Sequence, residues 1–142
     1  MIEMKKDELN EKMIRLHMEA CSVPLRVYGR IDSTNSEAKR YALGGGDAPM
    51  AFVADEQSDG RGRMGRGFYS PAGTGIYLSL LLPWQGESSE AVCLTCAAAV
   101  AVHRAILTVT GIETGIKWVN DLYVGDRKVC GILAEALYAS DT

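Results

Sequence analysis

Residues 50–82 read MAFVADEQSDGRGRMGRGFYSPAGTGIYLSLLL and place a glycine-rich segment between two apolar runs. The runs at residues 50–54 and 76–82 each predict an interior strand, because short apolar runs bounded by turn residues are typical of buried strands. Between them, residues 55–75 carry six glycines and one proline without a helical or strand period. Loops this long inside a compact domain are usually functional or disordered, so this loop is the first candidate for function.

Upstream of this stretch, the sequence predicts two helices and one strand, at residues 7–20, 35–43 and 25–29. The first helix follows from apolar residues that recur every three or four positions, with Asp7 as its N-cap. The second follows from Thr34 and Glu37, which stand three residues apart as in a capping box.

Downstream, the pattern predicts a long helix at residues 89–109, a short strand that ends at residues 117–118, and a hairpin of residues 122–124 and 127–133. Gly111 ends the helix, and Gly125-Asp126 suits the tight two-residue turn of the hairpin. The whole order of elements indicates an α+β fold with a mixed β-sheet and flanking helices.

Composition and charge narrow the class of protein. The chain has 142 residues, 47% of them hydrophobic and 23% charged, which predicts a globular domain that needs neither disulfides nor a structural metal. Its net charge of −3 argues against general binding to nucleic acid or to a membrane surface. No apolar run approaches the roughly 18 residues of a membrane span, the longest being residues 91–102, and the charged N-terminus shows no secretory signal. We therefore expect a cytoplasmic protein with no nucleic-acid or membrane partner.

The four cysteines, Cys21, Cys93, Cys96 and Cys130, are expected to be free, buried thiols. Cys93 and Cys96 form a C-x-x-C pair, but their spacing puts both on one apolar face of the predicted helix. No second Cys/His pair follows at zinc spacing. Core packing is therefore favoured over a metal site, and no metal ligand is assigned.

The loop contains GRGRMGRG at residues 60–67, which places three guanidinium groups on a glycine-rich backbone. Arginine forks bind phosphate and carboxylate, and the glycines let the backbone approach an anion closely. The spacing is neither a Walker A loop nor a dinucleotide-binding fingerprint. The alternative, a disordered Arg-Gly tail that binds RNA nonspecifically, is disfavoured because two strong strands flank the loop.

The segment KWVND at residues 117–121 joins a cation, an aromatic ring, an amide and a carboxylate where a strand meets a turn. Taken alone, an Asn-Asp pair is often only a turn former, and Trp118 suits a core as well as a ligand platform. Across the predicted hairpin, Lys128 can return to the same rim as Asp121 and face an anion held by the arginine loop. The alternative is a solvated lysine on an edge strand.

Four blocks in this order resemble the signature motifs of biotin protein ligases. They are Ser33-Thr34-Asn35, Glu56-Gln57 with the following Gly60–Arg66, Lys117–Asp121, and Arg127–Leu133. The resemblance extends from about residue 32 to residue 135. It implies the catalytic-domain fold of the biotin/lipoate ligase family, with residues 25–142 as the N-terminal portion of that domain and residues 1–24 as a helical segment ahead of it.

This resemblance implies a two-step reaction. Biotin and MgATP give biotinyl-5′-adenylate and pyrophosphate, and the biotinyl group then passes to a lysine of a carboxylase's biotin carboxyl carrier domain. The catalytic roles fall to Lys128 and Arg63. The residues implied for biotin are Ser33, Thr34, Asn35, Gln57, Arg61, Gly62, Arg63 and Lys128, and those implied for the nucleotide are Arg63, Arg66, Asn120 and Asp121.

The chain departs from the family pattern in two places. Val119 stands where the family commonly has proline, and the match stops soon after Glu135, whereas the family's catalytic domain continues. We therefore expect a domain truncated at the C-terminus, with an open sheet edge that favours a homodimer. The alternative function is a truncated, noncatalytic biotin-binding module of the same fold.

Two related functions are disfavoured by the same blocks. Lipoate ligases share the fold but lack the arginine loop and the Lys117–Asp121 block in this form. The residues ahead of Ser33 hold one amphipathic helix, too little for a winged DNA-binding domain, so no repressor function is expected.

Overall fold

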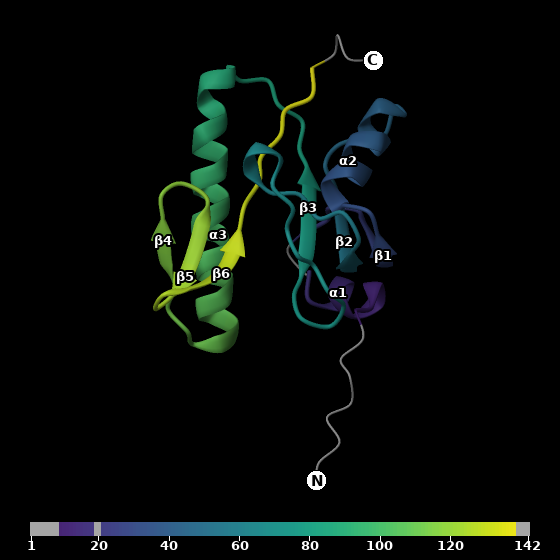
Figure 1. Cartoon of the computed structure of the whole chain (residues 1–142). Coiled ribbons are helices and arrows are strands. Elements are labelled where there is room, and N and C mark those ends of the chain that lie inside the picture. Colours follow the sequence, from purple (N-terminus) through teal and green to yellow (C-terminus); the bar gives the residue numbers. More distant parts are fainter. Residues whose placement is uncertain (1–8, 19–20, 139–142) are drawn as a thin grey trace. The chain divides into compact units, whose positions relative to one another are not determined.

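The computed structural model describes residues 9–18 and 21–138 of the chain. Contacts divide the chain into two compact units, whose elements are labelled in Figure 1. The first unit comprises the described residues up to Arg61, together with Gly65–Trp84 and the described residues Leu137 and Tyr138. The second comprises Gly62–Met64 and Gln85–Ala136. The division into residues 1–24 and 25–142 that the sequence suggests stays a prediction.

A three-stranded mixed sheet forms the centre of the first unit. Its strands are β1 (Leu25–Ile31), β2 (Met50–Gln57) and β3 (Tyr77–Leu81), in the order β1-β2-β3. β1 and β2 run parallel, which requires a crossover, and helix α2 (Thr34–Leu43) supplies it. β2 and β3 run antiparallel. A mixed sheet with a flanking helix confirms the α+β expectation.

The core of the first unit lies between α2 and β2. Phe52 of β2 is fully buried, and Met50, two residues earlier and so on the same face of the strand, is almost as well covered. Ala38 of α2 packs against both. Tyr41 meets Phe52 edge to face, with ring centroids 5.5 Å apart. This packing fixes α2 on the sheet and therefore fixes the residues at the N-terminus of α2.

Helix α1 (Glu11–Leu16) is shorter than the helix expected over residues 7–20. Asn10 is its N-cap, because the Asn10 side chain accepts hydrogen bonds from the backbone N–H groups of Lys12 at 2.9 Å and Met13 at 3.4 Å. The cap expected at Asp7 lies outside the described residues. The side chains of Met13 and Leu16 are more than half exposed, so the apolar stripe of this helix is not buried.

The N-cap of α2 is Ser33 rather than Thr34. Ser33 Oγ accepts a hydrogen bond from the N–H of Ser36 at 3.4 Å. Thr34 is the first helical residue, and Glu37 pairs with Arg40 instead of closing a capping box. The predicted capping box is therefore wrong: the N-cap lies one residue earlier, and the Thr34 side chain is engaged in the polar cluster described below.

The second unit contains a long helix and a three-stranded antiparallel sheet. A 3-10 turn (Ser88–Glu90) precedes α3 (Ala91–Thr110), and β4 (Gly115–Lys117), β5 (Asp121–Val124) and β6 (Arg127–Gly131) follow in the order β4-β5-β6. Gly111 ends α3 with a φ of 72°, and Gly125 turns the hairpin with a φ of 59°. Residues with a β-carbon disfavour such angles, so both glycines act as the sequence predicts.

Helix α3 corrects the expectation about membrane spans. Over Val92–Thr110 it is long and apolar enough to cross a membrane by length and composition, with a mean hydropathy of 1.9, so the sequence-based statement that no apolar run approaches this length is wrong. Length and composition are weak evidence for a span, because core helices of soluble proteins meet the same criterion.

All four cysteines are free, but Cys21 and Cys93 are exposed, so the expectation of buried thiols is wrong for these two. The cytoplasmic location stays a prediction.

Candidate functional site

A hydrogen-bonded polar cluster lies where β1 passes into α2. Ser33 and Thr34 are buried, and Asn35 and Gln57 are half-buried. The backbone N–H and the hydroxyl of Thr34 both donate to Gln57 Oε1, at 2.8 and 3.0 Å. The bonds join the N-terminus of α2 to the end of β2. The structure therefore brings together four of the residues that the sequence assigns to biotin.

Ser79 of β3 completes this cluster, and the sequence analysis missed it. Its hydroxyl is buried, donates to Thr34 Oγ1 at 2.8 Å, and also forms a short hydrogen bond with Asn35 Oδ1. The signal was present, since Ser79 is the one hydroxyl inside the apolar run at residues 76–82 apart from the tyrosine. Buried hydroxyls are rarely left without a partner, so a serine there indicates a polar contact across the sheet.

The start of the glycine loop closes onto the same cluster. Gln57 Nε2 donates to Ser70 Oγ at 3.0 Å, and the Phe68 N–H donates to the Gly60 carbonyl at 2.7 Å. A β-carbon on Gly60 would lie 2.2 Å from the Phe68 carbonyl oxygen and 2.6 Å from Ser70 Oγ. No side chain fits there, so Gly60 is required for the loop to approach Gln57. Gly60 belongs to the quoted motif but not to the predicted site residues.

The three arginines of the loop belong to two different units. Arg61 and Arg66 belong to the first unit and are exposed, and Arg61 lies in an isolated β-bridge with Gly67. Arg63 belongs to the second unit together with the half-buried Gly62, and its Nη1 donates to Asn120 Oδ1 at 2.9 Å. The sequence predicts all three as anion ligands, and the structure distributes them over two units.

A second group of predicted site residues lies at the start of the β5-β6 hairpin. Lys128 Nζ is 2.8 Å from Asp121 Oδ1, an oxygen that is itself buried. The expectation that Lys128 returns to the rim of Asp121 is therefore confirmed. Asn120 forms two hydrogen bonds with Ile132: its side-chain Nδ2 donates to the Ile132 carbonyl at 3.1 Å, and its backbone carbonyl accepts from the Ile132 N–H at 2.8 Å.

The surroundings of this second group are mixed in polarity. Trp118 is 79% exposed, which excludes its alternative as a core residue within the second unit. The Lys117 ammonium lies 5.4 Å from the centre of the Tyr123 ring, in a cation–π contact. Burial raises the pKa of the Cys130 thiol, while Lys128 opposes and Asp121 adds to that rise. Cys130 is therefore a neutral thiol at physiological pH.

Electrostatics at the β1–α2 turn centre on one carboxylate. The Arg40 guanidinium is hydrogen-bonded to Asp32 and lowers the pKa of that carboxyl from 3.8 to about 2, with the Ser33 N–H adding a smaller effect in the same direction. Burial beside Glu37 raises the pKa of the Tyr28 phenol, which donates to Glu37 Oε1 at 3.1 Å. Asp32 is therefore ionised at neutral pH.

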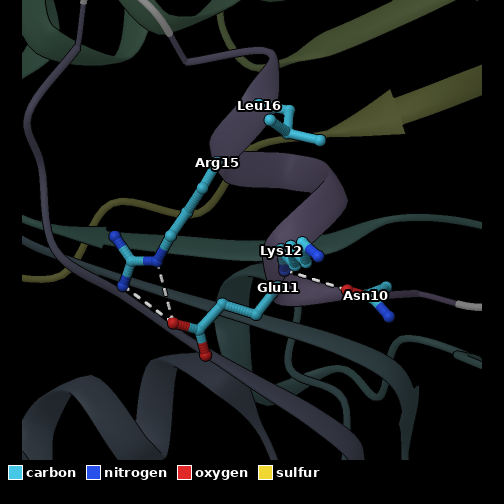
Figure 2. A pocket seen from close by; sticks show the side chains of 5 residues that line it. All are labelled: Asn10, Glu11, Lys12, Arg15 and Leu16. Atoms are coloured by element: carbon cyan, nitrogen blue, oxygen red, sulfur yellow. Dashed lines mark hydrogen bonds and ion pairs between the residues drawn. The ribbon is translucent and has the colours of Figure 1, made fainter.

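A surface hollow of about 590 Å³ lies elsewhere, along α1. Figure 2 shows the five residues that line it, all from α1 or its cap, with Arg15 reaching back to Glu11. Its polar side chains come from one short helix and its cap, and Arg15 and Glu11 are paired with each other. We therefore place the candidate site at the polar cluster instead, where groups from several elements meet. Within the described residues, no group of three His, Cys, Asp or Glu side chains is placed to hold a metal ion.

Comparisons with known proteins agree on one family. A family model described as "Biotin/lipoate A/B protein ligase family" matches residues 27–142. The bifunctional ligase/repressor BirA of Bacillus spizizenii is 38% identical over 133 residues, covering 92% of this chain and 41% of the relative. The biotin–[acetyl-CoA-carboxylase] ligase of Paracoccus denitrificans is 39% identical over 109 residues, covering 75% of this chain and 45% of the relative.

Among solved structures, the biotin protein ligase of Aquifex aeolicus in complex with biotin and ATP is similar, with a TM-score of 0.66 and 34% sequence identity. The match covers 80% of this chain and 47% of that one. The chain therefore spans less than half the length of these relatives.

Proposed function

Because the chain belongs to the biotin/lipoate A/B protein ligase family, we propose that it carries the biotin site of an ATP-dependent biotin protein ligase. The observation that carries this proposal is the cluster of Ser33, Thr34, Asn35 and Gln57 in one unit. Thr34 is hydrogen-bonded to Gln57, Ser79 links Thr34 with Asn35, and Ser33 is the buried N-cap of the same helix. The reaction forms biotinyl-5′-AMP and transfers its biotinyl group to a carrier-protein lysine.

The cluster suits the ureido ring of biotin. That ring presents one carbonyl acceptor and two N–H donors, and its recognition requires donors and acceptors that are already fixed in place. Thr34, Asn35 and Gln57 provide hydroxyl and amide groups of both kinds, half-buried or buried, at the end of the sheet. Hydrogen bonds made there are stronger than in water because the local dielectric constant is lower.

The cationic residues suit the anions of the first step. A biotin carboxylate oxygen attacks the α-phosphorus of ATP, a P–O bond forms, and the bond to pyrophosphate breaks. Two anions must approach each other, and Lys128 offsets their charge at the carboxylate and the α-phosphate. Arg61, Gly62 and Arg63 cover biotin and the adenylate, and Arg66 contacts the nucleotide phosphates.

Asn120 and Asp121 complete the proposed nucleotide side, near the phosphates or the Mg²⁺ that accompanies ATP. A carboxylate and an amide are oxygen donors of the type that Mg²⁺ prefers. Asp121 already holds Lys128 at 2.8 Å, so its second role is to keep that ammonium in place.

In the second step, the amine of the carrier lysine attacks the acyl carbon of the adenylate and AMP leaves. The mixed anhydride hydrolyses readily, so the loop must exclude water while the carrier docks. The Paracoccus relative is named for acetyl-CoA carboxylase, which supports a carboxylase carrier domain as partner. We propose in addition a homodimer, because β1 and β3 are edge strands of a three-stranded sheet in the first unit.

A noncatalytic biotin-binding module is the second candidate function. The whole polar cluster is formed by residues of the first unit, whereas Lys128 belongs to the second. The contacts proposed for the ureido ring of biotin are therefore separate from Lys128 and Arg63, the residues proposed for chemistry.

Incubation of the 142-residue chain with biotin and MgATP separates the two candidates. The ligase predicts release of pyrophosphate together with biotinyl-adenylate that stays bound to the protein. The binding module predicts a higher melting temperature with biotin and neither product. Both candidates are contradicted if biotin does not change the melting temperature of the chain and no pyrophosphate is released.

A further inference from the structure

We propose that Arg40, which lies on α2 outside the four sequence motifs, is a positioning residue for the biotin-site turn and acts on it through Asp32. The proposal rests on the proposed function, because the turn matters for activity only if its residues bind biotin. Ile31 ends β1 and Thr34 begins α2, so Asp32 and Ser33 form the entire link between them. The residues assigned to biotin follow Asp32 directly.

Arg40 binds the carboxylate of Asp32 through both terminal nitrogens of its guanidinium group. Nη1 donates to Asp32 Oδ2 at 2.8 Å, and Nη2 donates to Asp32 Oδ1 at 2.8 Å. The same Oδ1 accepts the Ser33 N–H at 2.7 Å. A two-point contact fixes the plane of the carboxylate, and that plane in turn fixes the direction of the Ser33 N–H.

The other contacts of Arg40 fix the guanidinium itself. Nε and Nη2 both donate to Glu37 Oε2, at 3.0 and 2.8 Å, and Glu37 Oε1 accepts from the hydroxyl of Tyr28 on β1. The pair with Glu37 is an ordinary contact between neighbouring turns of a helix. The reach to Asp32, eight residues away, is the additional contact that joins the helix to the turn.

The backbone of the same turn is anchored to the start of the glycine loop. The carbonyl of Ile31 accepts from the Ser58 N–H at 2.9 Å, and that of Asp32 accepts from the Asp59 N–H at 2.8 Å. The Thr34 N–H donates to Gln57. A rotation of the Asp32–Ser33 peptide therefore changes the cluster and the loop together. Of the contacts that hold this peptide, the guanidinium clamp is the one made by a side chain outside the motifs.

The geometry distinguishes positioning from plain stabilisation. The Arg40 side chain is 52% exposed and that of Asp32 43%, and ion pairs at such exposure contribute little to stability. Loss of the clamp therefore changes the melting temperature slightly. Its larger effect falls on the geometry of three consecutive biotin contacts, where a small displacement costs much affinity.

The test compares Arg40→Gln and Arg40→Lys with the control Arg15→Gln. The control removes an exposed ion pair between Arg15 and Glu11, whose side chains are each 48% exposed, together with a hydrogen bond of 3.3 Å from Arg15 to the Leu25 carbonyl. Calorimetry of the whole chain with biotin gives the affinity, and KM for biotin and for ATP are measured separately. We expect Arg40→Gln to raise the Kd and the KM for biotin about tenfold, with the KM for ATP and the melting temperature as in the control. Arg40→Lys keeps the charge but not the fork, so it recovers only part of the affinity.

Amide hydrogen exchange of the chain alone provides a readout that does not need biotin. We expect faster exchange at the N–H groups of Ser33 and Thr34 in Arg40→Gln and no change in the control. Unchanged exchange, or a biotin Kd equal to that of the control, overturns the role of Arg40. If the chain itself fails to bind biotin, the proposed function fails, and the exchange measurement still decides whether Arg40 positions the turn.

Discussion

Substitution of Gly60 by alanine tests the link between the glycine loop and the polar cluster. A β-carbon at Gly60 would lie 2.2 Å from a backbone carbonyl oxygen, that of Phe68, and 2.6 Å from the Ser70 hydroxyl. Both distances are shorter than van der Waals contact, and the carbonyl belongs to backbone that cannot rotate away. Ser70 must move, and with it the hydrogen bond that Gln57 Nε2 donates at 3.0 Å.

The magnitude follows from the contact and from the hydrogen bond. Forcing one extra carbon into well-packed surroundings destabilises a protein by about 1–3 kcal/mol. For a chain of this length, a loss of about 2 kcal/mol lowers Tm by roughly 6 °C. The orientation of the Gln57 amide changes at the same time, so we expect the biotin Kd to rise by roughly tenfold or more, since a misplaced group loses that much.

Gly67→Ala is the matched control in the same loop. Nothing lies within 4 Å of a β-carbon built on Gly67, and its φ is not positive. We expect its Tm and biotin Kd to stay at the values of the unsubstituted chain. Thermal unfolding and titration calorimetry on both variants check this, and equal effects of the two substitutions would refute the reasoning, because the steric clash exists only at Gly60.

Three further predictions concern charge. Lys128→Ala should lower the rate of adenylate formation about a hundredfold or more while biotin Kd changes little, as pyrophosphate release and calorimetry will show; equal losses in both would remove its assigned role. Arg63→Ala should release biotinyl-adenylate about tenfold faster, because it loses one hydrogen bond to a charged group. A retention assay on a desalting column measures this, and unchanged release would contradict the covering role of Arg63. Because Arg40 lowers the pKa of Asp32 from 3.8 to about 2, the stability that Asp32 contributes is present above pH 4 and lost as pH falls towards 2. Discounted for exposure, it amounts to about 1 kcal/mol, and Asp32→Asn should flatten that part of an acid-unfolding curve.

The sheet was predictable from the sequence because its strands are locally encoded. The apolar runs at residues 50–54 and 76–82 and the Gly125 turn give β2, β3 and the hairpin within a few residues. The extent of helix α1 was not predictable, because Met13 and Leu16 stay exposed instead of packing against another element. Its N-cap is Asn10, three residues after the expected Asp7, so the helix is shorter than its apolar pattern suggests. Local periodicity indicates what could be buried, whereas burial itself depends on what packs against it.

The residues of the candidate site also divide into those that local sequence predicts and those that it does not. The four blocks contain the residues that the structure joins, including Thr34 with Gln57 and Asp121 with Lys128. Ser79 and Ser70 carry no motif, and Ser79 meets Thr34 across 45 positions of the chain. Such contacts depend on strand register, since a shift of one residue in β3 would turn Ser79 to the opposite face of the sheet.

Two of the cations proposed for phosphate already have protein acceptors. Lys128 is paired with Asp121 and Arg63 with Asn120, and both acceptors belong to the same block at residues 120–121. An incoming phosphate therefore replaces an ion pair at Lys128 and a hydrogen bond at Arg63 rather than contacting an unpaired cation. The gain in affinity from each contact is smaller than the full strength of the new bond. The arrangement instead fixes where the two cations lie before the proposed nucleotide binds. Preorganised charge of this kind lowers the barrier for the attack of one anion on another, because it needs no rearrangement at the moment of reaction.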